Sequence, residues 1–388
     1  MSANSLIIKA LLGLTILLFL TACNNDKPAI PDEPGYKPTP YEIDIPYAFP
    51  TKLNIPDDNP MTEEGVALGR FLFYDGRLSG RTHPDSLMSC STCHIQKNNF
   101  EPGIDHPVFE GGFVHGLSGQ QTHHVVLPLI NLVWNNSGYG WNGGIYKNND
   151  NPNYRTIEDF VRIAVMASDE IDGDTNQVKA LFQSLDGYPE LFYKAFGSQK
   201  ITFNNIEKAI AQFVRTFVSA EAKIDRYLRG EEQLSQSELN GFILFTTEEG
   251  ADCFHCHGGF GNPLFTTHLF YNNGKDTIFD DFADRFAVTG DVMDKGAYKA
   301  PTLRNISLSG PYMHDGRFET LDEVIDFYSH HLQISEQVDP LMHHLLRGGV
   351  QLTPNEKADL KAFIASLHDE NFLNNPAYSK PEKFPDEP

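Results

Sequence analysis

The sequence predicts an all-α fold with two helical domains, and three observations support this. Apolar residues recur at helical spacing in several separate segments, which is typical of helices that bury one face. Glycine- and asparagine-rich stretches separate these segments, the longest of them over 103–121 and 135–154. The length of 388 residues accommodates two domains of about 150 residues each, and we place the boundary at 215/216.

The apolar pattern predicts helices over 63–74, 156–166 and 204–218. The last of these has one apolar stripe, formed by Ile206, Ile210, Phe213 and Phe217. Such stripes are typical of helices that pack on a protein core.

Capping residues predict where helices begin. Thr156 is a suitable N-cap for the second segment. Ser235 with Glu238, and Thr353 with Glu356, form capping boxes ahead of two further apolar runs. In the second box a proline occupies the first helical position, where its missing N–H is tolerated.

The N-terminus indicates export. Residues 10–20 form an apolar run that is too short to span a bilayer comfortably. The sequence Leu20-Thr21-Ala22-Cys23 follows and resembles a bacterial lipobox, in which the cysteine becomes the lipidated first residue. We therefore interpret 1–22 as a lipoprotein signal peptide and 23–50, rich in Asn, Asp and Pro, as a flexible tether. An ordinary signal peptide with a chance cysteine is the alternative.

The domains then span 51–215 and 216–388. The residue after Cys23 is asparagine, which by resemblance to enterobacterial lipoproteins favours the outer over the inner membrane. The expected location is the periplasm, with the lipid on Cys23 as the membrane anchor.

The other four of the five cysteines form two Cys-x-x-Cys pairs, each followed at once by histidine. The motifs are Cys90-Ser91-Thr92-Cys93-His94 and Cys253-Phe254-His255-Cys256-His257. This pattern predicts attachment of c-type haem, in which the two thiols form thioethers and the histidine binds the iron. A redox dithiol does not need the histidine, and a zinc site needs the four cysteines to converge. Two covalent haem c groups are therefore the favoured interpretation.

The formal net charge of −22 excludes nucleic acid as a partner. An acidic surface suits a basic or mixed-charge electron donor, although it also serves solubility alone. The mean hydropathy of −0.35 excludes a protein with many membrane spans.

Several further motifs resemble the bacterial di-haem cytochrome c peroxidase family, which includes the MauG-type enzymes. The resemblance extends over about 52–370. Its most specific part is Lys299-Ala300-Pro301-Thr302-Leu303-Arg304-Asn305, followed by Pro311-Tyr312-Met313-His314-Asp315-Gly316. Other matches are Leu68-Gly69-Arg70-Phe71-Leu72-Phe73 and Ile201-Thr202-Phe203-Asn204-Asn205-Ile206.

The resemblance implies two cytochrome-c-like helical domains with one haem each, both facing the domain seam. It implies that the N-terminal haem reacts with peroxide and the C-terminal haem transfers electrons. The expected activity is an oxidoreductase that reduces hydrogen peroxide to water with electrons from a small cytochrome c or cupredoxin. Two alternatives stay open: a MauG-like enzyme that oxidises a protein substrate through high-valent iron, and a non-catalytic electron-transfer cytochrome. Family members are often homodimers.

The family also implies two catalytic residues. In Asp169-Glu170-Ile171, Glu170 matches the distal glutamate that moves a proton between the peroxide oxygens. In Trp141-Asn142-Gly143, Trp141 matches a tryptophan that relays electrons between the haems. A surface position for Glu170 and simple packing for Trp141 are the alternatives.

The sixth ligand of the C-terminal iron distinguishes the subfamilies. In the family it lies fourteen residues after the histidine of the Pro-Tyr-x-His motif, which here is Tyr328. Peroxidases have methionine at this position and MauG-type enzymes have tyrosine; methionine raises the reduction potential and phenolate should lower it. The alternative ligands are Met293, Met313 and Met342.

Two features of the family are less well matched. His115-Gly116 resembles the loop that carries a distal histidine ligand of the N-terminal iron, and His123 and His124 are further candidates. Ser309 and Pro311 match carbonyl ligands of a calcium ion, but Val125 stands where the family has an asparagine ligand.

Overall fold

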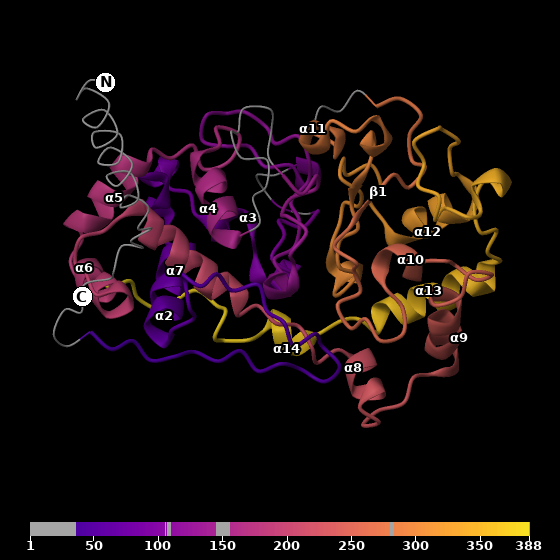
Figure 1. The fold of residues 1–388 in the computed structure, drawn as a ribbon, viewed down its shortest axis with the longest axis horizontal. Helices are drawn as coiled ribbons and strands as arrows, with labels where there is room; N and C mark the ends of the chain where they lie inside the picture. Colours follow the sequence, from indigo (N-terminus) through magenta and orange to yellow (C-terminus); the bar gives the residue numbers. More distant parts are fainter. Residues whose placement is uncertain (1–35, 105, 107–109, 145–155, 280–282, 388) are drawn as a thin grey trace, which may run out of the picture. The chain divides into compact units, whose positions relative to one another are not determined.

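The computed structural model describes residues 36–104, 106, 110–144, 156–279 and 283–387. The described residues from 37 to 387 belong to one helix-rich unit (Figure 1). The predicted signal peptide and Cys23, the predicted site of lipidation, lie outside the described residues. In the described part of the chain, no helix combines the length and the apolar character needed to cross a membrane.

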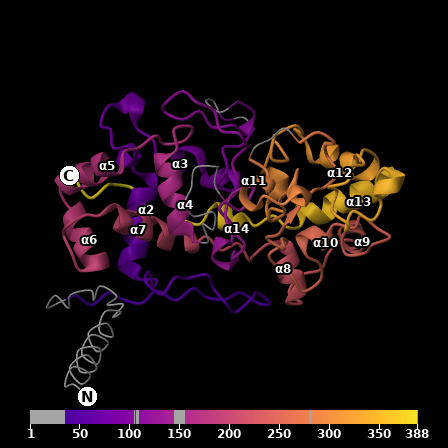
Figure 2. The same ribbon diagram turned by 45° about the horizontal axis from the view of Figure 1, so that its top comes forward.

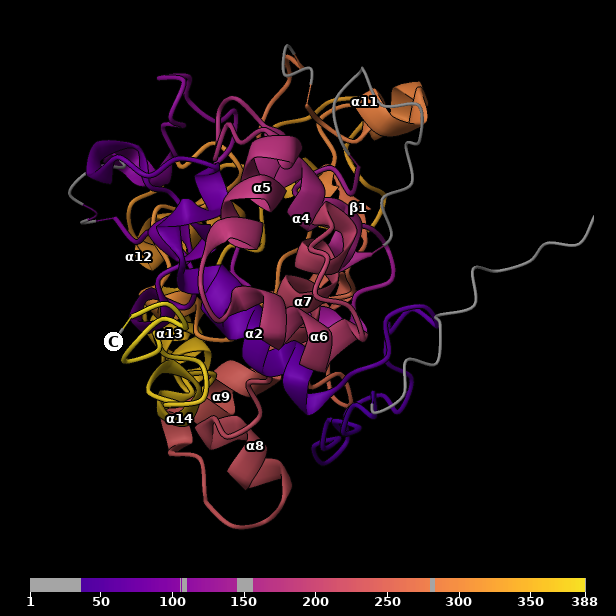
Figure 3. The ribbon, with the colours of Figure 1, turned by 90° about the vertical axis from the view of Figure 1, so that its left-hand side faces the viewer.

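The first hydrophobic core is built on five helices: α2 (Glu63–Tyr74), α4 (Ile157–Met166), α5 (Thr175–Ser184), α6 (Tyr188–Phe196) and α7 (Phe203–Arg215). α2 and α7 cross in direct contact at its centre (Figure 3). A Cβ atom on Gly69 of α2 would lie 1.9 Å from the carbonyl oxygen of Ala209 on α7, so glycine is needed for this approach.

The second core is built on α8 (Lys223–Leu228), α9 (Gln236–Phe245), α12 (Leu321–His330) and α13 (Pro354–Ala365). α9 and α13 pack side by side (Figure 2). Here too a glycine permits the contact, because a Cβ on Gly241 would lie 2.0 Å from the carbonyl oxygen of Asp359.

Short elements connect these helices. The one-turn helices are α3 (Cys90–Cys93), α10 (Phe254–His257), α11 (Phe286–Thr289) and α14 (Glu370–Leu373). Two strands, β1 (Phe270–Tyr271) and β2 (Tyr298–Lys299), pair antiparallel with Phe270 opposite Lys299. The 3₁₀ turns lie at Gly76–Ser79, Pro84–Ser86, Gln96–Asn98, Glu110–Gly112, Leu132–Trp134, Val292–Asp294, Ile306–Leu308 and Leu345–Arg347.

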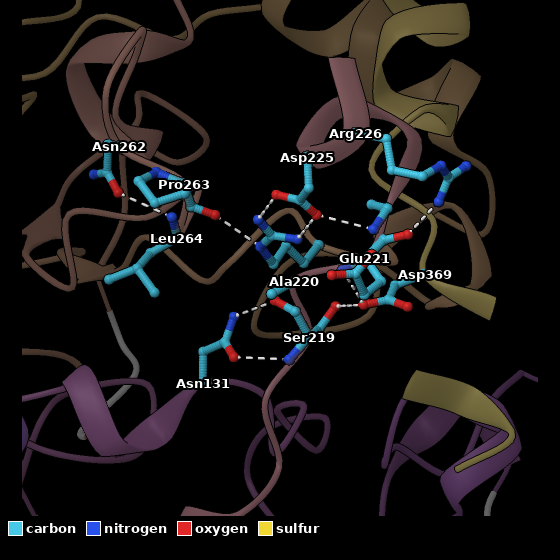
Figure 4. A network of polar contacts seen from close by, with 12 residues as sticks. Asn131, Ser219, Ala220, Glu221, Asp225, Arg226, Asn262, Pro263, Leu264 and Asp369 are labelled. Carbon is cyan, nitrogen blue, oxygen red and sulfur yellow. Dashed lines mark hydrogen bonds and ion pairs between the residues drawn. The ribbon is translucent and has the colours of Figure 1, made fainter. Parts of the chain in front are cut away.

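The chain between α7 and α8 carries a buried polar network (Figure 4). Ser219 exchanges hydrogen bonds with the Asn131 side chain and donates its hydroxyl to Asp369 over 2.8 Å. Further along the chain, the two terminal guanidinium nitrogens of Arg304 donate to the two carboxylate oxygens of Asp225 over 2.6 and 2.9 Å. Arg304 is 0% and Asp225 6% exposed, so this ion pair is buried.

The helices predicted over 63–74 and 156–166 are confirmed, as are both predicted capping boxes. α7 ends at Arg215, before the predicted Val218, and Phe217 lies outside the helix. The domain boundary at 215/216 stays a prediction. The first core draws on residues 68–217 and the second on 222–367, but Phe372, Leu373 and Tyr378 at the C-terminal end join the first core. A third cluster combines both ranges, because Val133 and Trp134 pack there with Leu264.

Candidate active site

The first Cys-x-x-Cys-His motif forms one turn of helix. α3 holds Cys90 and Cys93, and the His94 amide donates to the Cys90 carbonyl oxygen over 2.9 Å. The ring Nδ1 of His94 lies 2.6 Å from the carbonyl oxygen of Phe100. This contact places the ring proton on Nδ1 and leaves the lone pair on Nε2. Burial lowers the pKa of His94 to about 4, so the imidazole is neutral at pH 7.

Packing fixes the carbonyl group that orients His94. Phe100 is fully buried and stacks on Phe217, with ring centroids 4.1 Å apart and planes within 18°. Its backbone is left-handed, with φ of 58°, which turns the chain back toward the histidine. The aromatic contact with Phe217 therefore supports the orientation of the predicted iron ligand.

The second motif repeats this arrangement. The His257 amide donates to the Cys253 carbonyl oxygen over 3.0 Å, and its ring Nδ1 lies 3.0 Å from the carbonyl oxygen of Pro301. Burial lowers the pKa of His257 to about 4. Pro301 belongs to the Lys-Ala-Pro-Thr-Leu-Arg-Asn motif, and Thr302 anchors that motif by donating to the Leu264 carbonyl oxygen over 2.7 Å. A neutral imidazole with an available Nε2 is thus present in both motifs.

A cavity of about 210 Å³ lies against the second motif. Cys253, Cys256 and His257 line it together with Trp141 and Tyr328. Much of the remaining wall is aliphatic: Val324, Ile325, Leu332, Leu352, Leu360 and Ile364. A largely apolar cavity with two thiols and the His257 imidazole at its wall is suited to a flat, largely apolar group.

The donor set fits a covalently attached haem at both motifs. Cys90, Cys93, Cys253 and Cys256 are free thiols, and burial raises the pKa of each, to about 12 for Cys90, Cys253 and Cys256. Each pair spans one helical turn next to a neutral histidine, as two thioethers and one iron–imidazole bond require.

Tyr328 lies on α12 and its side chain is buried in the cavity wall. The side-chain amide of Asn273 donates to the Tyr328 hydroxyl over 2.8 Å. Burial raises the pKa of Tyr328, so it is a neutral phenol unless a cation lies beside it. Of the alternative ligands, Met313 and Met342 also line the cavity, whereas Met293 is 53% exposed and does not.

Glu170 lies in the turn that follows α4 and is electrostatically coupled to the first motif. Burial, with a smaller contribution from the Asp169 charge, raises the pKa of Glu170 to about 7. In turn, the Glu170 charge contributes to the raised pKa of Cys90 and of Cys93. A carboxyl group with a pKa near 7 can both accept and return a proton at neutral pH.

The loop that contains His115 holds this turn in place. The amide of Leu117 donates to the Glu170 carbonyl oxygen over 3.2 Å, and the hydroxyl of Ser118 donates to the Ser168 carbonyl oxygen. A Cβ on Gly116 would lie 2.7 Å from the Glu170 nitrogen, so the loop packs closely on the turn. His115 itself is exposed.

Trp141 contributes to the wall of the cavity at the second motif. Its indole N–H donates to the Val125 carbonyl oxygen over 2.8 Å, and its own carbonyl accepts from the Lys299 amide over 2.7 Å. Its ring lies 6.3 Å from that of His314, which stacks on Tyr298 at 3.5 Å. Trp141 therefore belongs to an aromatic cluster at the cavity.

The three candidate distal histidines lie in different environments. His115 and His123 are exposed, whereas His124 is half-buried with its ring 5.0 Å from that of His314. His124 therefore lies beside the aromatic cluster at the cavity of the second motif. A role for any of the three as a ligand of the first iron stays a prediction.

Oxygen atoms lie near the predicted calcium position, although Val125 offers no side-chain ligand there. Ser309 and Pro311 line the cavity. Asn99 donates to the Ser309 hydroxyl over 3.2 Å, and two buried oxygens, Oδ1 of Asn99 and Oε2 of Glu101, have no hydrogen-bond partner. These are hard donors of the kind calcium prefers. Calcium stays a prediction.

Sequence motifs did not single out Asn273 or Glu101. Asn273 contacts Tyr328 across 55 residues of chain, which no local pattern predicts. Glu101 is a charged residue between Phe100 and Pro102, and only its burial distinguishes it from a surface glutamate.

Comparison with known proteins identifies relatives of one kind. Residues 63–233 match the family model described as di-haem cytochrome c peroxidase. The methylamine utilization protein MauG of Methylorubrum extorquens is 31% identical over 320 residues, which are 82% of this chain and 82% of that protein. The cytochrome-c peroxidase IdrP1 of a Pseudomonas species is 28% identical over 346 residues, 81% of this chain and 83% of that protein.

Solved structures give the same result for the fold. A MauG-like protein associated with microbial copper homeostasis is 32% identical, with a TM-score of 0.73, and the match covers 88% of this chain and all of that one. The diheme peroxidase BthA of Burkholderia thailandensis shares the fold with a TM-score of 0.63 at 16% identity, over 89% of this chain and 98% of that one. The predicted family resemblance and the helix-rich fold are thus confirmed.

Proposed function

Because the chain belongs to the di-haem cytochrome c peroxidase and MauG family, we propose that it is a periplasmic peroxidase with two c-type haems that reduces hydrogen peroxide to water. The observation that supports this most directly is the pair of half-buried, neutral histidines, His94 and His257. Each has its Nδ1 bound to a backbone carbonyl oxygen and its Nε2 available for iron.

Cys90, Cys93 and His94 would hold one haem, and Cys253, Cys256 and His257 the other. When bound, the haems supply iron centres that exchange electrons with peroxide and with a donor. The two cores support a pair of cytochrome-c-like domains, with the haems facing the seam between them.

Glu170 would transfer a proton between the two oxygens of the peroxide. Its carboxylate accepts a proton from one oxygen of the peroxide and delivers it to the other, which leaves as water. A pKa of about 7 supports this role, because the group populates both forms at neutral pH. The close packing of Gly116 on the Glu170 backbone holds this part of the chain in place.

Trp141 would carry electrons between the two haem sites. Its position at the cavity wall, with its indole N–H hydrogen-bonded, supports a fixed ring orientation. Electrons would reach the C-terminal haem from a small cytochrome c or cupredoxin, for which the net charge of −22 favours a basic docking face.

A second candidate function is favoured by Tyr328. A phenolate at the C-terminal iron would disfavour its reduction, and such a protein would withdraw electrons from a partner protein in the manner of MauG. The hydrogen bond from Asn273 supports a phenolate at this position, because it stabilises negative charge on the hydroxyl oxygen.

Peroxide turnover distinguishes these functions. For the peroxidase, we expect the purified holoprotein to consume peroxide steadily with a reduced small cytochrome c or cupredoxin. For the MauG-like function, the donor is not consumed, and an oxidised state outlasts the peroxide until a partner protein is oxidised. Absence of any spectral change on adding peroxide to the oxidised and half-reduced protein would leave electron transfer alone.

We also propose that Cys23 carries the lipid anchor, which attaches the protein to the outer membrane on its periplasmic side. Labelling of cells with radioactive palmitate should mark the wild type and not Cys23→Ser. Equal labelling of both would contradict the anchor.

Calcium and a homodimer are the remaining parts of this proposal. The unpartnered oxygens of Asn99 and Glu101 beside Ser309 support a calcium ion, and one calcium per chain should survive gel filtration in calcium-free buffer. The elution volume in the same experiment measures the oligomeric state.

A further inference from the structure

A cluster of ligating side chains lies next to the second motif and includes none of the predicted iron ligands. The ligand atoms of Asp252, His255 and His343 all lie within 4.8 Å of one another. Nδ1 of His255 is 2.6 Å from one carboxylate oxygen of Asp252, and Nδ1 of His343 is 3.6 Å from the other. We propose that these three residues bind a divalent transition metal ion, Zn²⁺ or Cu²⁺, as a third metal centre.

The residue types match this class of ion. Two imidazole nitrogens and one carboxylate oxygen form a borderline donor set, which suits zinc and copper. Calcium and magnesium prefer sites made wholly of oxygen ligands. The donor set of the proposed site therefore favours zinc or copper over calcium and magnesium.

The spacing requires only small side-chain movements. Four ligands at about 2.0–2.2 Å from a tetrahedral ion lie about 3.4 Å from one another. The three ligand atoms already lie within 4.8 Å of one another, so no pair has to close by more than about 1.4 Å. Glu248 supplies a fourth ligand, because its carboxylate is 3.1 Å from Nδ1 of His343 and is 58% exposed, so it can rotate.

The backbone presents Asp252 to both histidines. Asp252 adopts a left-handed conformation with φ of 56°, at the turn between α9 and α10. His255 follows three residues later on α10, one helical turn away, so its ring faces the same carboxylate. Asp252 is only 7% exposed.

A contact of His344 holds the neighbouring His343 beside the turn that contains Asp252. Its Nε2 lies 2.7 Å from the carbonyl oxygen of Glu248, a contact that spans 96 residues of chain. The His344 carbonyl oxygen in turn accepts from the amides of Arg347 and Gly349. This buried contact fixes the segment that carries His343 beside Asp252.

The charges favour a bound cation. Asp252 and Glu248 contribute two negative charges, which a divalent ion would neutralise.

Metal binding to the full-length holoprotein tests the site. The protein is stripped with EDTA and dialysed against Zn²⁺ or, separately, Cu²⁺, and bound metal is measured by mass spectrometry. We expect one equivalent of either ion above the two irons. His255→Gln and His343→Gln should each weaken binding more than 100-fold, since changes outside the ligand set alone cost 10–100-fold.

His331→Gln is the matched control, because His331 is also paired with a carboxylate, Asp326, at 3.1 Å, but lies outside the cluster. It should bind metal as the wild type does. Haem absorbance verifies folding, since none of these changes alters a Cys-x-x-Cys-His ligand. In the copper arm, the electron paramagnetic resonance signal should show nitrogen coupling that both cluster variants lose. Equal binding by wild type and cluster variants, or no stoichiometric ion in the wild type, would overturn the site.

Discussion

The Asn273 side-chain amide donates a hydrogen bond to the Tyr328 hydroxyl over 2.8 Å, in a cavity that also contains His257. Among the described residues, the Tyr328 hydroxyl has no other hydrogen-bond partner. Burial raises the pKa of Tyr328. A phenolate here therefore needs a cation, and an iron held by His257 would be that cation.

Tyr328→Met should raise the reduction potential of the C-terminal haem, on the order of 100 mV, because a thioether favours ferrous iron more than a phenolate does. Spectroelectrochemistry measures the change. Tyr271→Phe is the matched control, since Tyr271 lines the same cavity but its hydroxyl pairs with Thr267 at 2.9 Å. If both variants keep the wild-type reduction potential, Tyr328 is not an iron ligand and only packs in the cavity wall.

Glu170→Gln should slow peroxide reduction by about 10²–10⁴-fold, because the amide cannot accept the proton. The wild-type rate should rise with pH through about 7, as Glu170 becomes a carboxylate, and the variant should lack this rise. Stopped-flow mixing with peroxide across pH measures both.

The neighbouring acid provides the control for Glu170. Asp169→Asn removes a charge that raises the pKa of Glu170, so the rise should move to lower pH while the maximal rate is kept. An unchanged rate in Glu170→Gln would exclude this residue from proton transfer.

Trp141→Phe should slow electron exchange between the haems, measured by flash reduction of one haem and the spectrum of the other. Trp134→Phe is a matched control, since both indoles donate one hydrogen bond to a backbone carbonyl, Val125 for Trp141 and Pro50 for Trp134. Each variant should lose about 1–3 kcal/mol of unfolding free energy. Equal exchange rates in the two variants would assign Trp141 to packing alone.

Local signals in the sequence predicted much of this architecture. The haem motifs and the N-caps lie within a few residues of chain, so one sequence reveals them. α12 (Leu321–His330) was not predicted, although Thr320 and Glu323 form the same kind of capping box that identified two other helices.

Contacts made by tertiary folding could not be predicted in this way. α7 ends before the predicted residue because Phe217 leaves the helix and stacks on Phe100, more than a hundred residues earlier in the chain. The Asn273–Tyr328 and His344–Glu248 contacts are of the same kind. Burial of Glu101 is likewise a property of the folded chain, and no periodicity marks it.

Asp225→Asn should destabilise the protein by about 3–5 kcal/mol, because it leaves the guanidinium of Arg304 buried without its partner charge. Asp225 also accepts from the Ala222 amide at the start of α8, so the helix end is weakened as well. Chemical denaturation of the holoprotein measures the loss. Glu190→Gln breaks an exposed pair with Lys194, which solvent screens, and should cost far less than the Asp225 change. Similar losses in both would show that burial adds nothing to the Asp225 pair.

Glu101→Gln should make the protein more stable than the wild type at alkaline pH. Burial raises the pKa of Glu101 from 4.5 to about 8, although hydrogen bonds with Ser309 and Asn99 act in the opposite direction. The folded state therefore binds a proton that the unfolded state has released above pH 4.5. Stability from this group is complete below pH 4.5 and is lost as the pH rises toward 8, by up to about 5 kcal/mol.

The test of Glu101 is the difference in unfolding free energy between variant and wild type from pH 4.5 to 9. The difference should grow in favour of Glu101→Gln up to about pH 8 and then level off, because both states of the wild type are then ionised. Glu382→Gln makes the same charge change at an exposed position and should give a flat difference. All samples are freed of calcium with EDTA, because a bound calcium ion would itself neutralise the Glu101 carboxylate. A flat difference for Glu101→Gln in these samples would contradict the raised pKa of Glu101.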